Sequence, residues 1–136
     1  MPTALKYARI LVLIELTRFL GLYLFSGIQS GALTANAELY AVGDALVAAT
    51  AIPAWYGLGK PGVRRYGLVI AWVAFGLTDL IYAIVDGALS GQLGAIGSLL
   101  GPGILAVPFN IVVQLVTLAL LFSKSVSTYA TKTLAN

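Results

Sequence analysis

The chain of 136 residues is 60% hydrophobic and 10% charged, carries a net charge of +3, and has a mean hydropathy of +0.95. Soluble domains average about 45–50% apolar and about 25% charged residues, so this composition excludes an ordinary soluble domain and indicates an integral membrane protein. Since the sequence contains no cysteine and no histidine, disulfides, thiolate chemistry and metal or haem sites with Cys or His ligands are excluded as well.

Four segments are apolar over roughly the 20 residues that a helix needs to cross a bilayer. In chain order they cover about residues 8–28, 39–59, 66–88 and 104–122. The connector KPGVRR has the composition of a tight turn, whereas SGQLGAIGSLLGPG, before the fourth segment, is rich in glycine yet apolar. For this second connector a flexible loop is favoured over a segment that lies on the membrane surface or dips into it. The pattern predicts one all-α domain over residues 1–136, a four-transmembrane-helix up-down-up-down bundle.

The basic residues indicate an orientation for this bundle. Every lysine and arginine except Arg18 lies near the start of the first segment, between the second and third, or after the fourth, namely Lys6, Arg9, Lys60, Arg64, Arg65, Lys124 and Lys132. The positive-inside rule makes that side cytoplasmic, so the N and C termini are both predicted to be cytoplasmic. Because topology explains these charges, the expected partner is the lipid bilayer and no nucleic-acid partner is expected.

Polar residues inside the predicted spans are the candidate functional residues. Glu15 and Arg18 are three residues apart in the first span and are predicted to form an ion pair on one helical face. Charged groups buried in a bilayer cost at least about 2.5–3.5 kcal/mol each, so they should face the interior of the bundle. Counted from the span ends, one polar layer in the outer half of the bundle would bind a substrate through Asp44, Asp79, Asn110, Arg18 and Gln114, with Tyr40, Thr78 and Tyr82 at its border.

The layer holds more carboxylates than cations. Arg18 is the one basic residue available for Glu15, Asp44 and Asp79, and a carboxylate left without a partner in an apolar medium takes up a proton rather than staying charged. Such a group is either a proton acceptor or a counter-charge for a bound cation. A structural role, in which these residues hold helices together by hydrogen bonds, stays open beside it.

The third span shows a further regularity. Trp72, Asp79 and Asp86 recur every seven residues and therefore share one helical face, with Asp86 expected simply as a residue at the helix end. Pro53 and Pro108 interrupt the second and fourth spans, and a bend at Pro108 would open the region that Asn110 faces.

A resemblance rests on the third span. Its Trp-x3-Gly-x2-Asp-Leu pattern, carried by Trp72, Gly76, Asp79 and Leu80, resembles that of a family of uncharacterised bacterial four-helix integral membrane proteins. The resemblance implies a four-span topology in the bacterial inner (plasma) membrane and implies no known activity.

Two functions remain on these grounds. The first is transport or binding of a small cationic or apolar molecule at the intramembrane carboxylates. The second is a non-catalytic accessory subunit of a larger membrane complex.

No enzymatic activity, cofactor or metal is expected, because the chain offers no nucleophile–histidine pair and its VGD sequence lacks the Gly-x-Gly-Asp signature of intramembrane aspartyl proteases. A homo-oligomer is expected, with small residues offered to a second copy, namely Ala45, Ala48, Ala49, Gly76 and Ala83.

Overall fold

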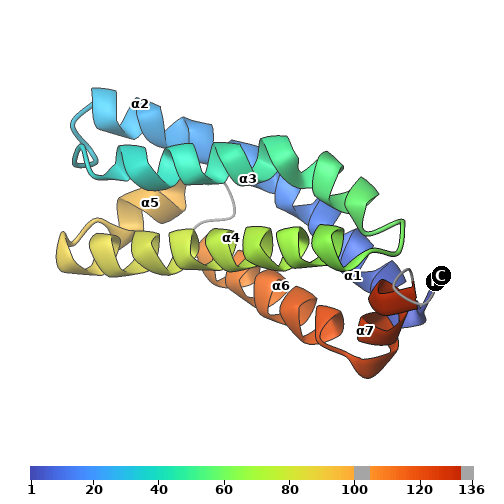
Figure 1. Ribbon diagram of the computed structural model, residues 1–136. Coiled ribbons are helices and arrows are strands. Elements are labelled where there is room, and N and C mark those ends of the chain that lie inside the picture. The colour runs from blue at the N-terminus through green and yellow to red at the C-terminus, as the bar shows by residue number, and fades with distance from the viewer. Residues whose placement is uncertain (100–104, 133–136) are drawn as a thin grey trace.

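The computed structural model describes residues 1–99 and 105–132, and every regular element in these ranges is a helix (Figure 1). In chain order these are α1 (Thr3–Ile14), the 3₁₀ helix η1 (Glu15–Tyr23), α2 (Leu24–Gln29), α3 (Ala37–Gly57), α4 (Val63–Leu89), α5 (Leu93–Leu99), α6 (Ala106–Leu121) and α7 (Lys124–Thr131). The prediction of an all-helical chain is confirmed for the described residues.

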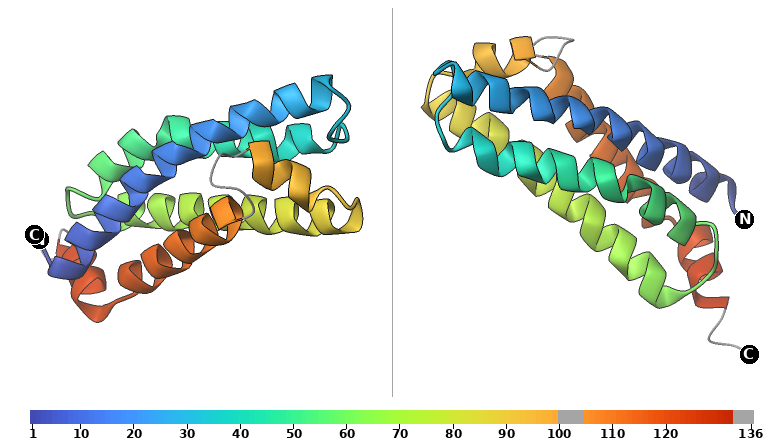
Figure 2. Two further views of the ribbon diagram at one scale, coloured as in Figure 1. Left: turned by 180° about the vertical axis from the view of Figure 1, so that it is seen from behind. Right: turned by 90° about the horizontal axis from the view of Figure 1, so that it is seen from above.

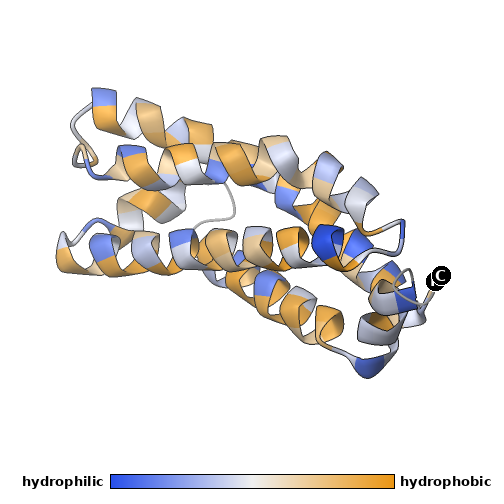
Figure 3. Cartoon of the chain, viewed as in Figure 1, coloured by the Kyte–Doolittle hydropathy of each residue, from blue (hydrophilic) through white to orange (hydrophobic). Residues whose placement is uncertain are grey.

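Three of the helical rods are long and apolar enough to cross a membrane. They are Thr3–Gln29, which joins α1, η1 and α2, together with α3 and α4. A fourth is reached when α6 and α7, which meet at a bend of 61°, are counted as one broken span. Many large apolar side chains of the rods are exposed, for example Leu39 at 64% and Leu68 at 63% exposure. Figure 3 shows apolar residues along each of the long helices. Such an apolar surface suits a hydrocarbon surrounding.

The rods lie side by side, with connections at two opposite ends (Figures 1 and 2). The start of α1, the connection from α3 to α4, and α7 gather at one end, called here the terminal end. Contacts there include Arg9, whose Nε donates to the Trp55 carbonyl oxygen at 3.2 Å. At the other, distal end, the Thr34 amide nitrogen donates to Gln92 Oε1 at 3.1 Å and ties together the turns that follow α2 and α4.

The apolar connector before α6 is not a flexible loop over residues 93–99. It forms α5, which packs against α2 and α4 and contacts η1. Two glycines make room for it, because Leu99 lies against Gly27, and Ile96 and Leu93 lie against Gly87. The apolar side chains of this connector therefore fill the distal end of the bundle, which is why the segment folds. Residues 100–103 of the connector lie outside the described residues.

The fourth predicted span differs from the expected continuous helix over 104–122. Residue 104 lies outside the described residues, and α6 covers Ala106–Leu121, beside α1 and α4 on the side of the terminal end. Pro108 is the third residue of α6, so it does not interrupt the helix as predicted. The first four amide groups of a helix have no partner within it, so proline is tolerated there. Pro53, in contrast, does lie inside α3.

Two apolar clusters fill the bundle, one at each end. The terminal-end cluster is built from α1, α4 and α6–α7 residues such as Leu5, Val73 and Leu121. The distal cluster includes Tyr40 and Ile96. Charged and amide side chains separate the two clusters and are themselves buried, namely Glu15, Arg18, Asp44 and Gln114. The core thus has an apolar–polar–apolar order along the bundle axis.

Some residues expected to meet a second copy are used within the chain. Ala48 is completely buried, Ala83 is buried in the distal cluster, and Gly76 lies against Gln114 and Arg18. The expected packing surface is wrong at these three positions, because neighbouring helices of the same chain already occupy them.

Candidate functional site

The 3₁₀ helix η1 aligns the buried polar residues of the first rod. Its buried residues are Glu15, Arg18 and Gly21, spaced by three. A 3₁₀ helix has three residues per turn, so side chains at i and i+3 lie directly above one another. The segment therefore presents the carboxylate, the guanidinium and a bare backbone position in one line toward the interior of the bundle.

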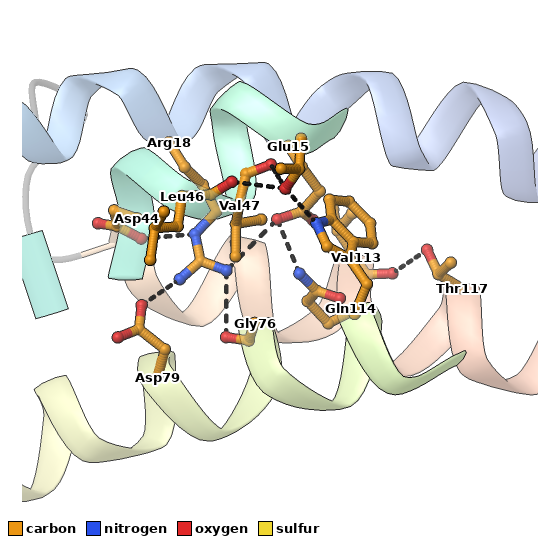
Figure 4. A network of polar contacts seen from close by, with 12 residues as sticks. Glu15, Arg18, Asp44, Leu46, Val47, Gly76, Asp79, Val113, Gln114 and Thr117 are labelled. Carbon is orange, nitrogen blue, oxygen red and sulfur yellow. Dashed lines mark hydrogen bonds and ion pairs between the residues drawn. The ribbon is translucent and has the colours of Figure 1, made fainter. Parts of the chain in front are cut away.

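Arg18 is the centre of the site and joins three rods (Figure 4). Its Nε donates to Asp44 Oδ1 of α3 at 2.5 Å, and its Nη2 donates to Asp79 Oδ2 of α4 at 2.5 Å. Its Nη1 donates to the Gly76 carbonyl oxygen at 3.1 Å. Only 1% of the Arg18 side chain is exposed, so these groups take the place of water around the guanidinium.

Glu15 extends the network toward α6. Its Oε2 lies 3.6 Å from Arg18 Nη1 and accepts a hydrogen bond from Gln114 Nε2 at 2.8 Å. Both side chains are buried, and Glu15 Oε1 accepts no hydrogen bond from the part of the chain that the structure describes. Glu15 and Arg18, which were predicted to pair from their spacing, lie within ion-pair distance. This is the longest of the three contacts between Arg18 and a carboxylate.

Three glycines on three rods make room for this network. A Cβ atom added to Gly21 would fall on the Asp44 side chain, and one added to Gly43 would fall on the carboxylate of Asp79. A Cβ added to Gly76 would lie 2.6 Å from Gln114 Nε2 and 2.8 Å from Arg18 Nη1. Each charged or amide group thus packs directly onto the backbone of a neighbouring helix, which brings the helices close together.

The shared face predicted on α4 is directed toward α3 and the turn before it. Trp72 Nε1 donates to Thr50 Oγ1 at 2.8 Å, and Asp79 lies against Gly43. Asp86 Oδ1 accepts from Asn36 Nδ2 at 3.4 Å. The three residues spaced by seven therefore hold α4 against one neighbour along its length. Of these three, Asp79 is the one that contacts Arg18.

A cavity of about 410 Å³ lies beside Arg18, between η1 and the start of α6. Its lining includes three of the predicted site residues, Arg18, Asp44 and Asn110, and is otherwise mostly apolar: Thr17, Leu20, Gly21, Leu80, Leu105, Val107 and Phe109. This volume is within the roughly 300–1,000 Å³ typical of small-molecule pockets.

The predicted site residues thus fall into three positions. Arg18, Asp44 and Asp79 are in direct contact, Gln114 joins them through Glu15, and Asn110 lies on the cavity wall. Their role in binding a substrate stays a prediction. Of the expected border residues, Thr78 is exposed and donates to its own helix at the Ala74 carbonyl oxygen, so it does not border the layer.

The other two expected border residues, Tyr40 and Tyr82, lie near each other. The Tyr40 and Tyr82 rings are 6.1 Å apart, and Tyr40 belongs to the distal cluster. Gly21 and Gly43 were missed as parts of the site. Their only sequence signal is position, since Gly21 follows Arg18 by three residues and Gly43 precedes Asp44.

Residues 3–122 match the family model described as Domain of unknown function (DUF8737). The chain belongs to this family. The match agrees with the expected membership of an uncharacterised family. No match was found among curated proteins or among solved structures. Within residues 1–99 and 105–132, no group of three or more His, Cys, Asp or Glu side chains is arranged to hold a metal ion.

Proposed function

We propose that this protein is a small multi-pass membrane protein that binds and transports a small cationic or apolar molecule at its buried carboxylates. The observation that carries the proposal is the cavity of about 410 Å³ bordered by Arg18 and Asp44. A mostly apolar pocket with a few convergent polar groups is the usual form of a small-molecule site. Arg18 and Asp44 form an ion pair that borders this pocket, so a bound ligand can take the place of one partner in the pair.

The charge arrangement supports exchange. Arg18 contacts carboxylates on three segments of chain, so it keeps two partners when the third accepts a proton or a ligand cation. Glu15 is the most weakly bound of the three, at 3.6 Å, and is buried. Since one guanidinium cannot neutralise three carboxylates, a proton or a cation is needed for charge balance. We propose that binding replaces such a proton or the arginine contact at one carboxylate.

The proposal includes a placement in the membrane. Four crossings in up-down-up-down order would bring the terminal end to the cytoplasm, supported by the basic residues near that end, such as Arg9, Lys60 and Lys124. The bacterial inner membrane is supported by the sequence resemblance alone. A homo-oligomer is supported by small residues that stay partly or fully exposed, such as Ala45 and Ala49.

A second candidate function is an accessory subunit of a larger membrane complex. It is favoured by the glycine contacts, because Gly21, Gly43 and Gly76 pack the polar groups so closely that the network serves well as an internal clamp. Under this alternative the cavity is a packing defect without a ligand. Purification in mild detergent separates the two, since a second chain in fixed ratio supports the accessory subunit.

Cysteine accessibility tests the proposal without knowledge of the ligand. The chain has no cysteine, so single substitutions give an unambiguous label. Val107 lines the cavity, whereas Val113, on the same helix and similarly buried, is absent from its lining. With 2-aminoethyl methanethiosulfonate we expect Val107→Cys to be modified much faster than the matched Val113→Cys in membranes. Equal modification rates would contradict the proposed binding site.

A further inference from the structure

The cavity opens on the flank of the bundle. Several lining residues are themselves exposed there, with Leu20 at 41%, Phe109 at 54% and Leu105 at 69% exposure. These side chains belong to the same outward apolar surface that suits a hydrocarbon surrounding. A molecule that enters between η1 and α6 therefore comes from the interior of the bilayer, and an apolar body favours that route.

The inner wall of the cavity is charged. Asp44 lines it together with Arg18, and the Asp44 carboxylate lies against the backbone of Gly21, a further lining residue. Asp79 and Glu15 contact the guanidinium from outside the lining. Arg18 can thus give up Asp44 and still keep two carboxylates, which leaves Asp44 available to a ligand.

The sign of the ligand charge follows from this arrangement. Three carboxylates surround one guanidinium, so an entering anion meets a surplus of negative charge, whereas an entering cation offsets it. Phe109 adds an aromatic ring to the lining, and aromatic ring faces attract cations.

We infer that the cavity takes a lipophilic monocation from the bilayer, with the cationic group at Asp44 and the apolar body against Leu20, Leu80 and Val107. This inference rests on the proposed function, and it adds the charge of the ligand, its route of entry and the carboxylate that holds it.

Phenyltrimethylammonium is a suitable probe, because tert-butylbenzene has the same shape without the charge. We expect the labelled cation to bind saturably to the full chain in lipid nanodiscs. Excess tert-butylbenzene and excess benzenesulfonate are expected to compete poorly. Equal competition by tert-butylbenzene would overturn the charge selectivity, and no saturable binding at all would overturn the inference as a whole.

Two test variants, each with a matched control variant, locate the site. Asp44→Asn should weaken binding of phenyltrimethylammonium by about tenfold or more, whereas Asp86→Asn, at the distal end, should leave it unchanged. Thr17→Trp, at the exposed rim, should slow association with the charge network intact, while Thr78→Trp, exposed on α4 and outside the lining, should not. The inference would be overturned if Asp44→Asn bound the cation with wild-type affinity and Thr17→Trp bound it at the wild-type rate. Either result in a folded variant would count against the inference if the other variant folded poorly.

The failure of this inference and that of the proposed function have different outcomes. If Val107→Cys reacts faster than Val113→Cys but the cation does not bind, the cavity is accessible and the ligand class is wrong. If both cysteines react equally slowly, the cavity is closed and the proposed function itself fails.

Discussion

Replacing Gly43 with alanine tests whether the charged network depends on close backbone packing. The added Cβ atom would lie 2.5 Å from Asp79 Cγ, closer than a carbon–carbon contact of about 3.5–4.0 Å permits. Asp79 must then withdraw from Arg18 Nη2, which it now contacts at 2.5 Å. The substitution therefore breaks an ion pair without removing either charged residue.

The expected loss of stability follows from three contributions. Removing one partner of a buried ion pair costs about 3–5 kcal/mol, and overpacking a core costs about 1–3 kcal/mol. The lower end of each range applies, because Asp79 is displaced rather than removed. Alanine in a helix interior returns about 0.5–1 kcal/mol relative to glycine. We expect a net decrease of about 3 kcal/mol in the free energy of unfolding of Gly43→Ala.

Unfolding in mixed micelles of mild detergent and dodecyl sulfate, followed by circular dichroism, measures this difference. Gly67→Ala on α4 is the matched control, since a Cβ at Gly67 meets no atom within 4 Å, and it should be neutral or slightly stabilising. A double-mutant cycle with Asp79→Ala should reduce the cost of Gly43→Ala, because the obstructed carboxylate is then gone.

Two results would refute this reasoning. If Gly43→Ala unfolds like Gly67→Ala, the close approach has no energetic weight. If the cost of Gly43→Ala is the same in the Asp79→Ala background, the loss has a different cause from the displaced carboxylate.

Three further predictions concern single residues. Arg18→Lys should lose about 3 kcal/mol or more, or fail to accumulate in membranes, because one ammonium group cannot reach carboxylates on three segments; a wild-type unfolding midpoint would contradict this. Tyr66→Phe should lose about 0.5–1.5 kcal/mol in the same assay, since the Tyr66 hydroxyl donates to the Leu121 carbonyl oxygen at 2.6 Å. Pro108→Ala should change stability by no more than about 0.5 kcal/mol and leave the helix content by circular dichroism unchanged, because Pro108 lies in the first turn of α6; a gain in helix content would show that the proline does interrupt a helix.

The sequence alone determined the helical class and the apolar rods. Runs of about 20 apolar residues leave no alternative to helices in a bilayer, because each helix satisfies its own backbone hydrogen bonds. Sequence spacing also determined local neighbours, as for Glu15 and Arg18, and the common face of Trp72, Asp79 and Asp86. These are properties of one helix, and its periodicity is sufficient to derive them.

The tertiary structure alone decided which carboxylates Arg18 contacts and how the last part of the chain folds. Residues 18, 44 and 79 meet because Gly21, Gly43 and Gly76 allow three rods to approach, and no periodicity within one segment reports that fit. In the same way α5 folds onto Gly27 and Gly87, at sites built by distant parts of the chain. Packing between helices depends on the shapes of both partners, so the site and the cavity beside it exist only once the bundle has assembled.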